Sequence, residues 1–163
     1  MDALAEITLE QGPVALRRAR PDDVPAIVAL IAADQLGATR DGVRDEADLA
    51  AYTAAFRAID LDPAHLLLVA DSGGEIVGTM QLSFLPGLAR RGALRAQIEA
   101  VRVAPSTRGS GLGAAMMAWA IEEARRRGCA LVQLTSDKSR TDAHRFYQRL
   151  GFAASHEGMK LAL

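Results

Sequence analysis

The 163-residue sequence contains one cysteine, few aromatic residues and almost no net charge. A lone cysteine, Cys129, cannot form an internal disulfide, so the chain is expected in a reducing cytoplasm, with Cys129 as a small core residue. Aromatic residues make up 4% of the chain, which leaves little surface for stacking nucleic-acid bases. A formal net charge of −1 attracts neither nucleic acid nor an anionic membrane. We therefore expect no nucleic acid and no membrane among the partners.

Long apolar runs are also missing. No segment approaches the ~20 apolar residues that a membrane-spanning helix needs. The N-terminal MDALAEITLEQG carries acids and no basic region before an apolar stretch, so we expect no signal peptide. The length suits one domain with a substantial core. Residues 1–13 are predicted to form a flexible tail and residues 14–163 a single domain.

The rest of the chain alternates between strand and helix patterns. Apolar residues recur at helical spacing over residues 24–35, 45–59, 112–127 and 142–150. Strands, two of them joined by the hairpin turn DSGG, are predicted at residues 14–18, 65–70, 75–84, 94–103, 131–135, 151–154 and 159–163. This order predicts an α/β (α+β) fold with a mixed, mostly antiparallel central sheet of roughly six to seven strands, flanked by about four helices.

The stretch RGSGLG, residues 108–113, follows the strand run IEAVRVAP and opens a helix. A glycine-rich turn at a helix start exposes unpaired backbone N–H groups, which together with the helix dipole favour an anion. Arg108 adds a positive charge, so a phosphate is the expected ligand. The simpler alternative is a glycine-rich turn that only packs the helix against the strand.

Two known phosphate loops fit this stretch poorly. A nucleotide triphosphatase loop needs Gly-Lys-Ser/Thr, whereas two alanines follow Gly113. The dinucleotide fingerprint G-x-G-x-x-A does match residues 109–114, and Asp137 lies near the position of a ribose-binding acid. However, only residues 138–163 remain after Asp137, which is too little chain for the rest of that sheet.

A third kind of loop matches better. The segment Arg108-x-x-Gly111-x-Gly113, after a strand that ends in VRVAP, resembles the pyrophosphate loop of the GNAT superfamily of acyl-CoA-dependent N-acetyltransferases. AHRFYQRLGF, residues 143–152, resembles the family's C-terminal motif A-x-x-F-Y-x-x-x-G-F. The resemblance covers residues 16–163 and implies the GNAT fold, an N-acetyltransferase domain over residues 14–163 and the pyrophosphate of coenzyme A as the anion.

The resemblance also implies the reaction and a cosubstrate site. An acetyl group would move from acetyl-CoA to a primary amine of a small molecule or peptide by direct attack. The pantetheine arm would lie along Val101–Val103, with the amide of Val103 or a neighbour as donor to the thioester carbonyl. The implied cosubstrate-binding residues are Val101, Arg102, Val103, Arg108, Gly109, Ser110, Gly111, Leu112, Gly113, Ala114, Arg140 and Tyr147. Many members carry asparagine where this chain has Arg140, and an arginine there would reach a phosphate instead.

Two side chains are candidates for the proton transfers. Glu99 is the only acid in LRAQIEAVRV, and strand alternation predicts that it shares a face with Val101 and Val103 and is partly buried. It would deprotonate the incoming ammonium, directly or through water; the alternative is a strand-edge glutamate paired with Arg95 or Arg102. Tyr147, on the apolar face of the last helix, would protonate the departing thiolate, and its alternative is a core tyrosine.

The acceptor is less well marked. The resemblance places its site around residues 34–48 and 86–92. Acids that would attract an amine are Asp34, Asp41, Asp45, Glu46 and Asp48, and arginines that would hold an acidic group are Arg90, Arg91 and Arg95. The two sets together are compatible with a small amine that carries an acidic group, and the simpler interpretation is that both sets are solvated surface. A noncatalytic acyl-CoA-binding module and a dinucleotide-binding domain remain alternatives, and a homodimer is a family expectation.

Overall fold

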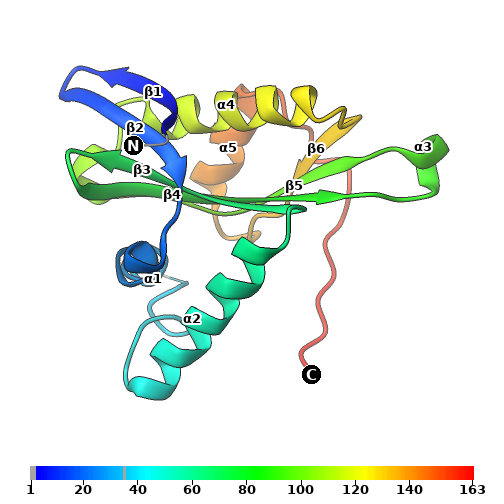
Figure 1. Ribbon diagram of the computed structural model, residues 1–163. Coiled ribbons are helices and arrows are strands. Elements are labelled where there is room, and N and C mark those ends of the chain that lie inside the picture. The colour runs from blue at the N-terminus through cyan, green and yellow to red at the C-terminus, as the bar shows by residue number, and fades with distance from the viewer. Residues whose placement is uncertain (1–2, 35) are drawn as a thin grey trace. The chain divides into compact units, whose positions relative to one another are not determined.

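The computed structural model describes residues 3–34 and 36–163. The chain forms two compact units, Met1–Gln133 and Leu134–Leu163, which are described separately. The strands are β1 (Ala3–Leu9), β2 (Gly12–Arg18), β3 (His65–Ser72), β4 (Glu75–Leu85), β5 (Arg95–Val103) and β6 (Leu131–Leu134). The helices are α1 (Val24–Ala32), α2 (Glu46–Leu61), α3 (Ala89–Gly92), α4 (Leu112–Arg126) and α5 (Thr141–Arg149), with 3₁₀ turns η1 (Pro21–Asp23) and η2 (Pro105–Thr107) (Figure 1).

The six strands form one mixed sheet in the order β1-β2-β3-β4-β5-β6. Neighbours from β1 to β5 are antiparallel. The Ala130 N–H donates to Leu94 O, and Gln133 Nε2 donates to Gln97 Oε1. In both contacts, the residue near β6 comes 36 positions after the residue near β5. A constant offset means that β5 and β6 run in the same direction, with α4 as their crossover. The predicted fold class is confirmed.

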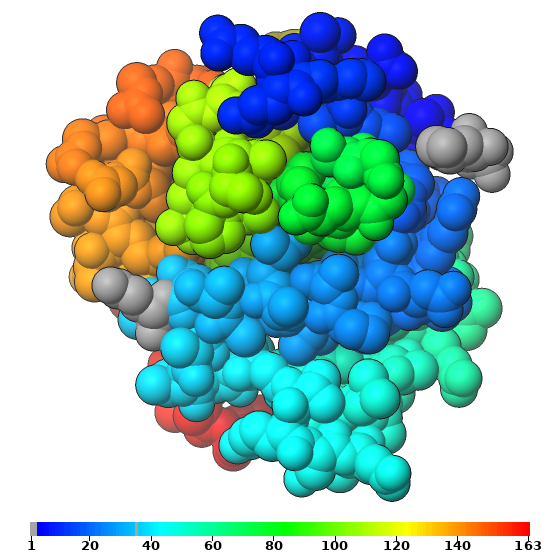
Figure 2. All heavy atoms as spheres, turned by 90° about the vertical axis from the view of Figure 1, so that its left-hand side faces the viewer, coloured from blue at the N-terminus to red at the C-terminus, as the bar shows by residue number. Residues whose placement is uncertain are grey.

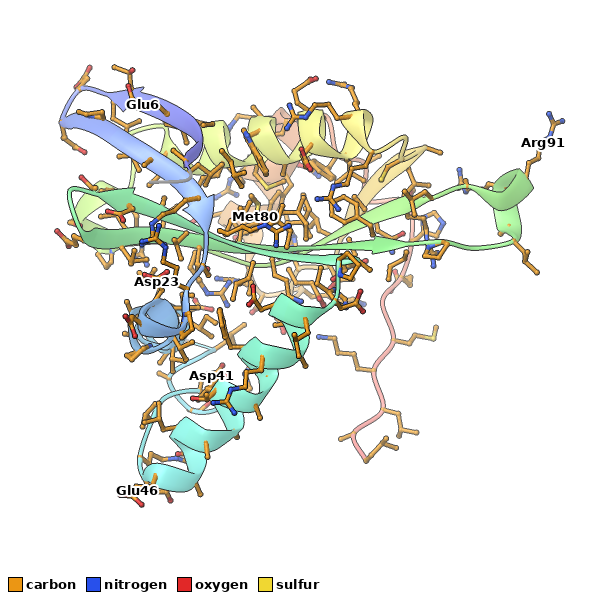
Figure 3. All side chains as sticks on the ribbon, viewed as in Figure 1. Glu6, Asp23, Asp41, Glu46, Met80 and Arg91 are labelled. Atoms are coloured by element: carbon orange, nitrogen blue, oxygen red, sulfur yellow. The ribbon has the colours of Figure 1, made fainter. Side chains whose placement is uncertain are left out.

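Helices cover both faces of the sheet in the first unit: α4 lies on one face, and α1 and α2 on the other (Figure 1). On the α4 face, Met116 Sδ lies 3.0 Å from the position that a Cβ on Gly78 would take. Met80, labelled in Figure 3, and Leu82 are fully buried there, as is Met116. The buried residues of α4 recur at helical spacing, so one face of the helix packs against the sheet.

An ion-pair network joins β2, β3 and η1. Arg17 donates to both carboxylate oxygens of Asp23, at 2.7 and 3.0 Å, and to Asp71 at 3.0 Å. Burial alone would raise the pKa of Asp23, but hydrogen bonds from the Arg17 guanidinium and the Arg20 N–H outweigh burial and lower it. Asp23 lies where the chain enters α1 (Figure 3). The network therefore sets the direction in which α1 leaves the sheet.

Two segments differ from the sequence predictions. Ala3–Leu9, predicted as a flexible tail, is strand β1, which pairs with β2 from Ala3↔Arg17 to Leu9↔Gly12. Residues 151–154 and 159–163, predicted as strands, form none, so the sheet has six strands in the part of the chain that the structure describes. Met159 and Leu161 alternate as strand residues do, but alternation does not supply a pairing partner.

Candidate active site

A β-bulge interrupts β5 beside the predicted catalytic glutamate. Gln81 pairs with Glu99 and Thr79 with Arg102, so Met80 alone stands opposite two residues of β5. One of the two, Ala100, has a φ of 52°, in the left-handed region that costs a non-glycine residue about 1 kcal/mol or more. Such bulges bend a strand and redirect its side chains.

The bulge reverses the alternation of side chains beyond Glu99. Register partners point to the same face of a sheet. Glu99 and Gln81 therefore share a face with Thr79 and Arg102, whereas Val103, which pairs with Gly78, points to the α4 face. The prediction that Glu99 and Val103 share a face is wrong, because strict alternation assumes a regular ladder. Glu99 faces the side of the sheet that carries α1 and α2.

The end of β5 extends past the end of β6. By the offset established above, Leu134 at the end of β6 lies level with Ile98. Glu99–Val103 therefore continue beyond the last residue of β6, where that edge of β5 has no strand partner among the described residues. An exposed strand edge presents peptide groups that an extended amide chain can pair with. The pantetheine arm of coenzyme A is such a chain, so this edge fits the predicted cosubstrate.

The glycine loop, residues 108–113, connects η2 to α4. Gly109 and Gly111 have φ values of 79° and 88°, and Gly111 is the N-cap of α4. No hydrogen-bond acceptor lies within the described part of the chain for the N–H groups of Gly111, Gly113 and Ala114. Arg108 is exposed, and the loop is at the surface beside the turn between β3 and β4 (yellow-green in Figure 2). Unpaired N–H groups at the start of a long helix fit a pyrophosphate.

Glu99 is exposed rather than partly buried, and its carboxylate has no hydrogen bond or ion pair among the described residues. The alternative pairing with Arg102 is wrong, because Arg102 Nη2 lies 3.3 Å from Asp34 Oδ2 instead. The pairing with Arg95 is also not formed. Glu99 is therefore a solvent-accessible carboxylate at the bulge, available to bind an ammonium group.

Tyr147 and Arg140 belong to the second unit. Tyr147 lies on α5 and makes edge-to-face contacts with Phe146 and Phe152, at centroid distances of 5.2 and 5.9 Å. Arg140 is the N-cap residue of α5, and its N–H donates to Asp137 O. The aromatic contacts hold the Tyr147 ring in a fixed orientation within this unit. Glu99 and the glycine loop belong to the first unit.

Several acids predicted to attract the acceptor have structural partners. Asp45 Oδ1 accepts from the Asp48 N–H and caps α2, Asp48 pairs with Arg44, and Asp41 accepts from the Tyr52 hydroxyl. Glu46 is exposed at the start of α2 (Figure 3). The acids of this segment thus mainly stabilise the loop before α2 and its N-terminus.

The predicted anion-binding arginines are also dispersed. Arg90 and Arg91 have left-handed φ values of 54° and 61° at the tip of the β4–β5 hairpin, and Arg91 points away from the sheet (Figure 3). Arg95 pairs with Leu85 at the start of β5. Arg95, Gln97 and Glu99 occupy alternate positions along β5, so all three lie on the same face before the bulge. Of the arginines in this set, Arg95 is the one on the strand and face of Glu99.

Sequence reasoning missed the uncharged polar residues around Glu99. Gln81, Ser83 and Gln97 lie on the same face of β4 and β5, although their neighbours Leu82 and Ile98 are buried on the opposite face. The signal was present as the alternating runs Q-L-S and Q-I-E, which place each polar residue on the face of Glu99. The fourth residue, Gln133, is linked to Gln97 by a hydrogen bond of 2.7 Å.

A metal site, a membrane-spanning helix and a reactive thiol each place requirements on the described residues. No group of three or more His, Cys, Asp or Glu side chains within residues 3–34 and 36–163 has the arrangement of a metal site. Over the same residues, no helix is long and apolar enough to cross a membrane. Cys129 is half-buried, and burial raises the pKa of its thiol, which disfavours a reactive thiolate.

Comparisons with known proteins agree with this geometry. The model of the acetyltransferase (GNAT) family matches residues 28–152. An aminoalkylphosphonate N-acetyltransferase of Salmonella typhimurium is 35% identical over 86% of this chain and 86% of its own length. A glucosamine 6-phosphate N-acetyltransferase of Trypanosoma brucei brucei is 40% identical over 55% of this chain and 59% of its own. A solved structure described as a transcriptional regulator from Bacillus halodurans C-125 is 45% identical, with a TM-score of 0.88 over 92% of this chain and 99% of that one.

The chain therefore belongs to the acetyltransferase (GNAT) family. It is an acetyl-CoA-dependent N-acetyltransferase, which transfers an acetyl group to an amine and uses acetyl-CoA as its cosubstrate. The family, the activity and the cosubstrate predicted from the sequence are confirmed.

Proposed function

We propose that the protein acetylates a small amine that carries an acidic group, with Glu99 as proton acceptor and Tyr147 as proton donor. The position of Glu99 carries the proposal. It is an exposed carboxylate without a partner in the described chain, on the α1/α2 face, where the bulged β5 runs past β6. An ammonium group that reaches this carboxylate gives up its proton directly or through a water molecule, and the neutral amine becomes the nucleophile.

The proposed cosubstrate site consists of the glycine loop and the exposed edge of β5. Residues 108–114 bind the pyrophosphate through backbone N–H groups, with Arg108 as an added charge. The backbone of Val101–Val103 holds the pantetheine arm, and the amide of Val103 or a neighbour donates to the thioester carbonyl, which is worth a few kcal/mol of barrier (~3 kcal/mol). Tyr147 gives its proton to the departing thiolate, and Arg140 contacts a phosphate. Acetyl-CoA supplies the activated acetyl group.

Two relatives support the acceptor class. The names of the Salmonella and Trypanosoma enzymes each describe an amine that also bears a phosphonate or phosphate group. In this chain, Arg95 is exposed on the face and strand of Glu99. An amine at Glu99 and an acidic group toward Arg95 are therefore the proposed orientation of the acceptor.

We also propose the bounds of the domain, the location of the protein and its oligomeric state. Residues 14–163 belong to the N-acetyltransferase domain, in keeping with the family match over residues 28–152, and β1 adds an edge strand to its sheet. The protein works in the cytoplasm as a homodimer, without nucleic acid or membrane partners. The half-buried single cysteine and the near-neutral net charge support the location and the absence of charged macromolecular partners.

The test measures thiol release from acetyl-CoA over a panel of amines. Glu99→Gln is expected to lower kcat/KM by roughly 10²- to 10⁴-fold, and Tyr147→Phe by a similar range. The matched control is Glu6→Gln, an exposed glutamate on β1 (Figure 3), which is not expected to change the rate. Unchanged rates in both catalytic variants would show that the roles are misassigned.

Ligand binding tests the two alternatives that the sequence alone left open. Acetyl-CoA is expected to raise the melting temperature, and NAD is not. Stabilisation by NAD alone would favour the dinucleotide-binding domain. Stabilisation by acetyl-CoA without thiol release on any amine would favour a noncatalytic binding module.

A further inference from the structure

Four polar side chains form a continuous row across four strands of the sheet. His65 on β3 pairs with Ser83 on β4, and Ser83 pairs with Gln97 on β5. His65 Nδ1 lies 2.8 Å from Ser83 Oγ, and Gln133 Nε2 on β6 donates to Gln97 Oε1 at 2.7 Å. We call these residues the polar row: His65, Ser83, Gln97 and Gln133. Since register partners point to one side, the row faces the same side as Glu99.

The polar row lies one same-face step from Glu99. Gln97 and Glu99 are two positions apart before the bulge, which corresponds to about 7 Å along the strand. The next row toward the bulge is Leu67–Gln81–Glu99. A molecule whose amine contacts Glu99 can therefore extend along β5 and reach the row.

The row is unlike the rest of this sheet face. Farther along β3, Val69 is fully buried in an apolar cluster with Val24 and Phe56. Ser83 is also buried, at 5% exposure, but it is polar. A buried hydroxyl group destabilises the fold unless it is hydrogen-bonded. Its partner His65 is held by its neighbours, with Asp62 Oδ2 3.8 Å from Nε2. The side chains of the row are thus positioned by contacts within the row and beside it.

The row also offers donors that the described chain does not use. The carbonyl oxygen of Gln97 accepts from Gln133, which leaves the Gln97 amide N–H groups without an acceptor among the described residues. No carboxylate belongs to the row, and the next same-face residue outward on β5 is Arg95. Amide donors with a guanidinium beyond them suit oxygen atoms that accept hydrogen bonds.

We propose that the polar row recognises an oxygen-bearing group of the acceptor, with Gln97 and Gln133 as its specificity-determining residues. The inference rests on the proposed function, because it takes Glu99 as the place where the amine binds. The acceptor lies along β5, with its amine at Glu99 and a hydroxyl, carboxylate or phosphonate oxygen at the Gln97–Gln133 pair. Ser83 and His65 lie beside that pair, on β4 and β3, and Arg95 favours an anionic oxygen group.

The experiment compares acceptors with and without the oxygen group. The probes are n-propylamine, 3-aminopropanol, 3-aminopropanoate and 3-aminopropylphosphonate, assayed by thiol release from acetyl-CoA. The variants are Gln97→Leu and Gln133→Leu, with Gln11→Leu, an exposed glutamine at the β1–β2 turn, as the control. For the oxygen-bearing probes, the row variants are expected to raise the acceptor KM roughly tenfold. The KM for acetyl-CoA and the rate on n-propylamine should stay the same.

A charge variant distinguishes a loss of acceptor recognition from a general loss of folding. Gln97→Glu keeps the side-chain size and is expected to weaken 3-aminopropanoate and 3-aminopropylphosphonate more than 3-aminopropanol, because it places like charges together. Equal losses on n-propylamine and the oxygen-bearing probes, in both the leucine and glutamate variants, would overturn the inference and leave the proposed function standing. No thiol release by the wild-type protein on any amine would overturn both.

Discussion

Replacing Gly111 with alanine tests whether the glycine loop binds the cosubstrate. At Gly111 φ is 88°, and a Cβ added there would meet no atom within 4 Å, so the substitution acts through backbone conformation alone. Alanine in the left-handed region costs about 1 kcal/mol or more, and the loop can relieve this only by turning the peptide. Each N–H lost from a charged ligand costs about 1.5–3 kcal/mol. The loss of one such bond predicts a roughly 10- to 100-fold weaker Kd for acetyl-CoA.

Gly128→Ala is the matched control for this experiment. Gly128 ends the same helix, has a φ of 76° and would likewise place an added Cβ in open space, with no atom within 4 Å. Both variants should lose a similar amount of unfolding free energy, about 1 kcal/mol, whereas only Gly111→Ala should weaken acetyl-CoA binding in calorimetry. If Gly111→Ala bound acetyl-CoA as tightly as the wild type, the N–H groups at the start of α4 would not be the pyrophosphate site.

Two further predictions concern the ion-pair network beneath α1. Asp23→Asn should lower the unfolding free energy in urea by about 1.5–3 kcal/mol, because Arg17 would lose its bidentate carboxylate and keep only Asp71 as a charged partner; a loss below 1 kcal/mol would contradict this. The folded-state pKa of Asp23 lies below its ordinary value of 3.8, so its contribution to stability is present above that pH and is lost as the pH falls through the lower folded value. As the pH is lowered, the unfolding free energy of Asp23→Asn should therefore fall less than that of the wild type. Parallel curves of unfolding free energy against pH would contradict this prediction.

The elements that sequence predicted well are those whose signals are local. The stripe on α4 and the glycine at its end fix that helix within a few residues, and DSGG fixes the β3–β4 hairpin. The positive φ values of Gly109 and Gly111 fall where the phosphate-loop interpretation needs them. In each case one short segment contains both the residues that form the structure and those that end it.

The bulge in β5 could not be predicted in the same way. Its left-handed residue is Ala100, whereas sequence rules assign that conformation to glycine. The bulge exists only relative to β4, where Met80 faces two residues, and the pairing register is not written in β5 itself. One inserted residue in β5 moves every later side chain of that strand to the opposite face of the sheet. For this reason, regular alternation predicts the wrong face for Val103.

The acceptor site illustrates a similar limit for charge. A carboxylate is visible in a sequence, but the residue that neutralises it can be far away: Asp34 pairs with Arg102 at a separation of 68 residues. Several of the acids expected to bind an amine are used for pairing and capping. Glu99 stays available because Arg102, which the bulge places on the same face, pairs with Asp34 instead. An amine is then held by one carboxylate, and discrimination among amines falls to the uncharged groups beside it. Those groups are brought together by the pairing of β3, β4, β5 and β6, so acceptor choice in this protein is a property of sheet register.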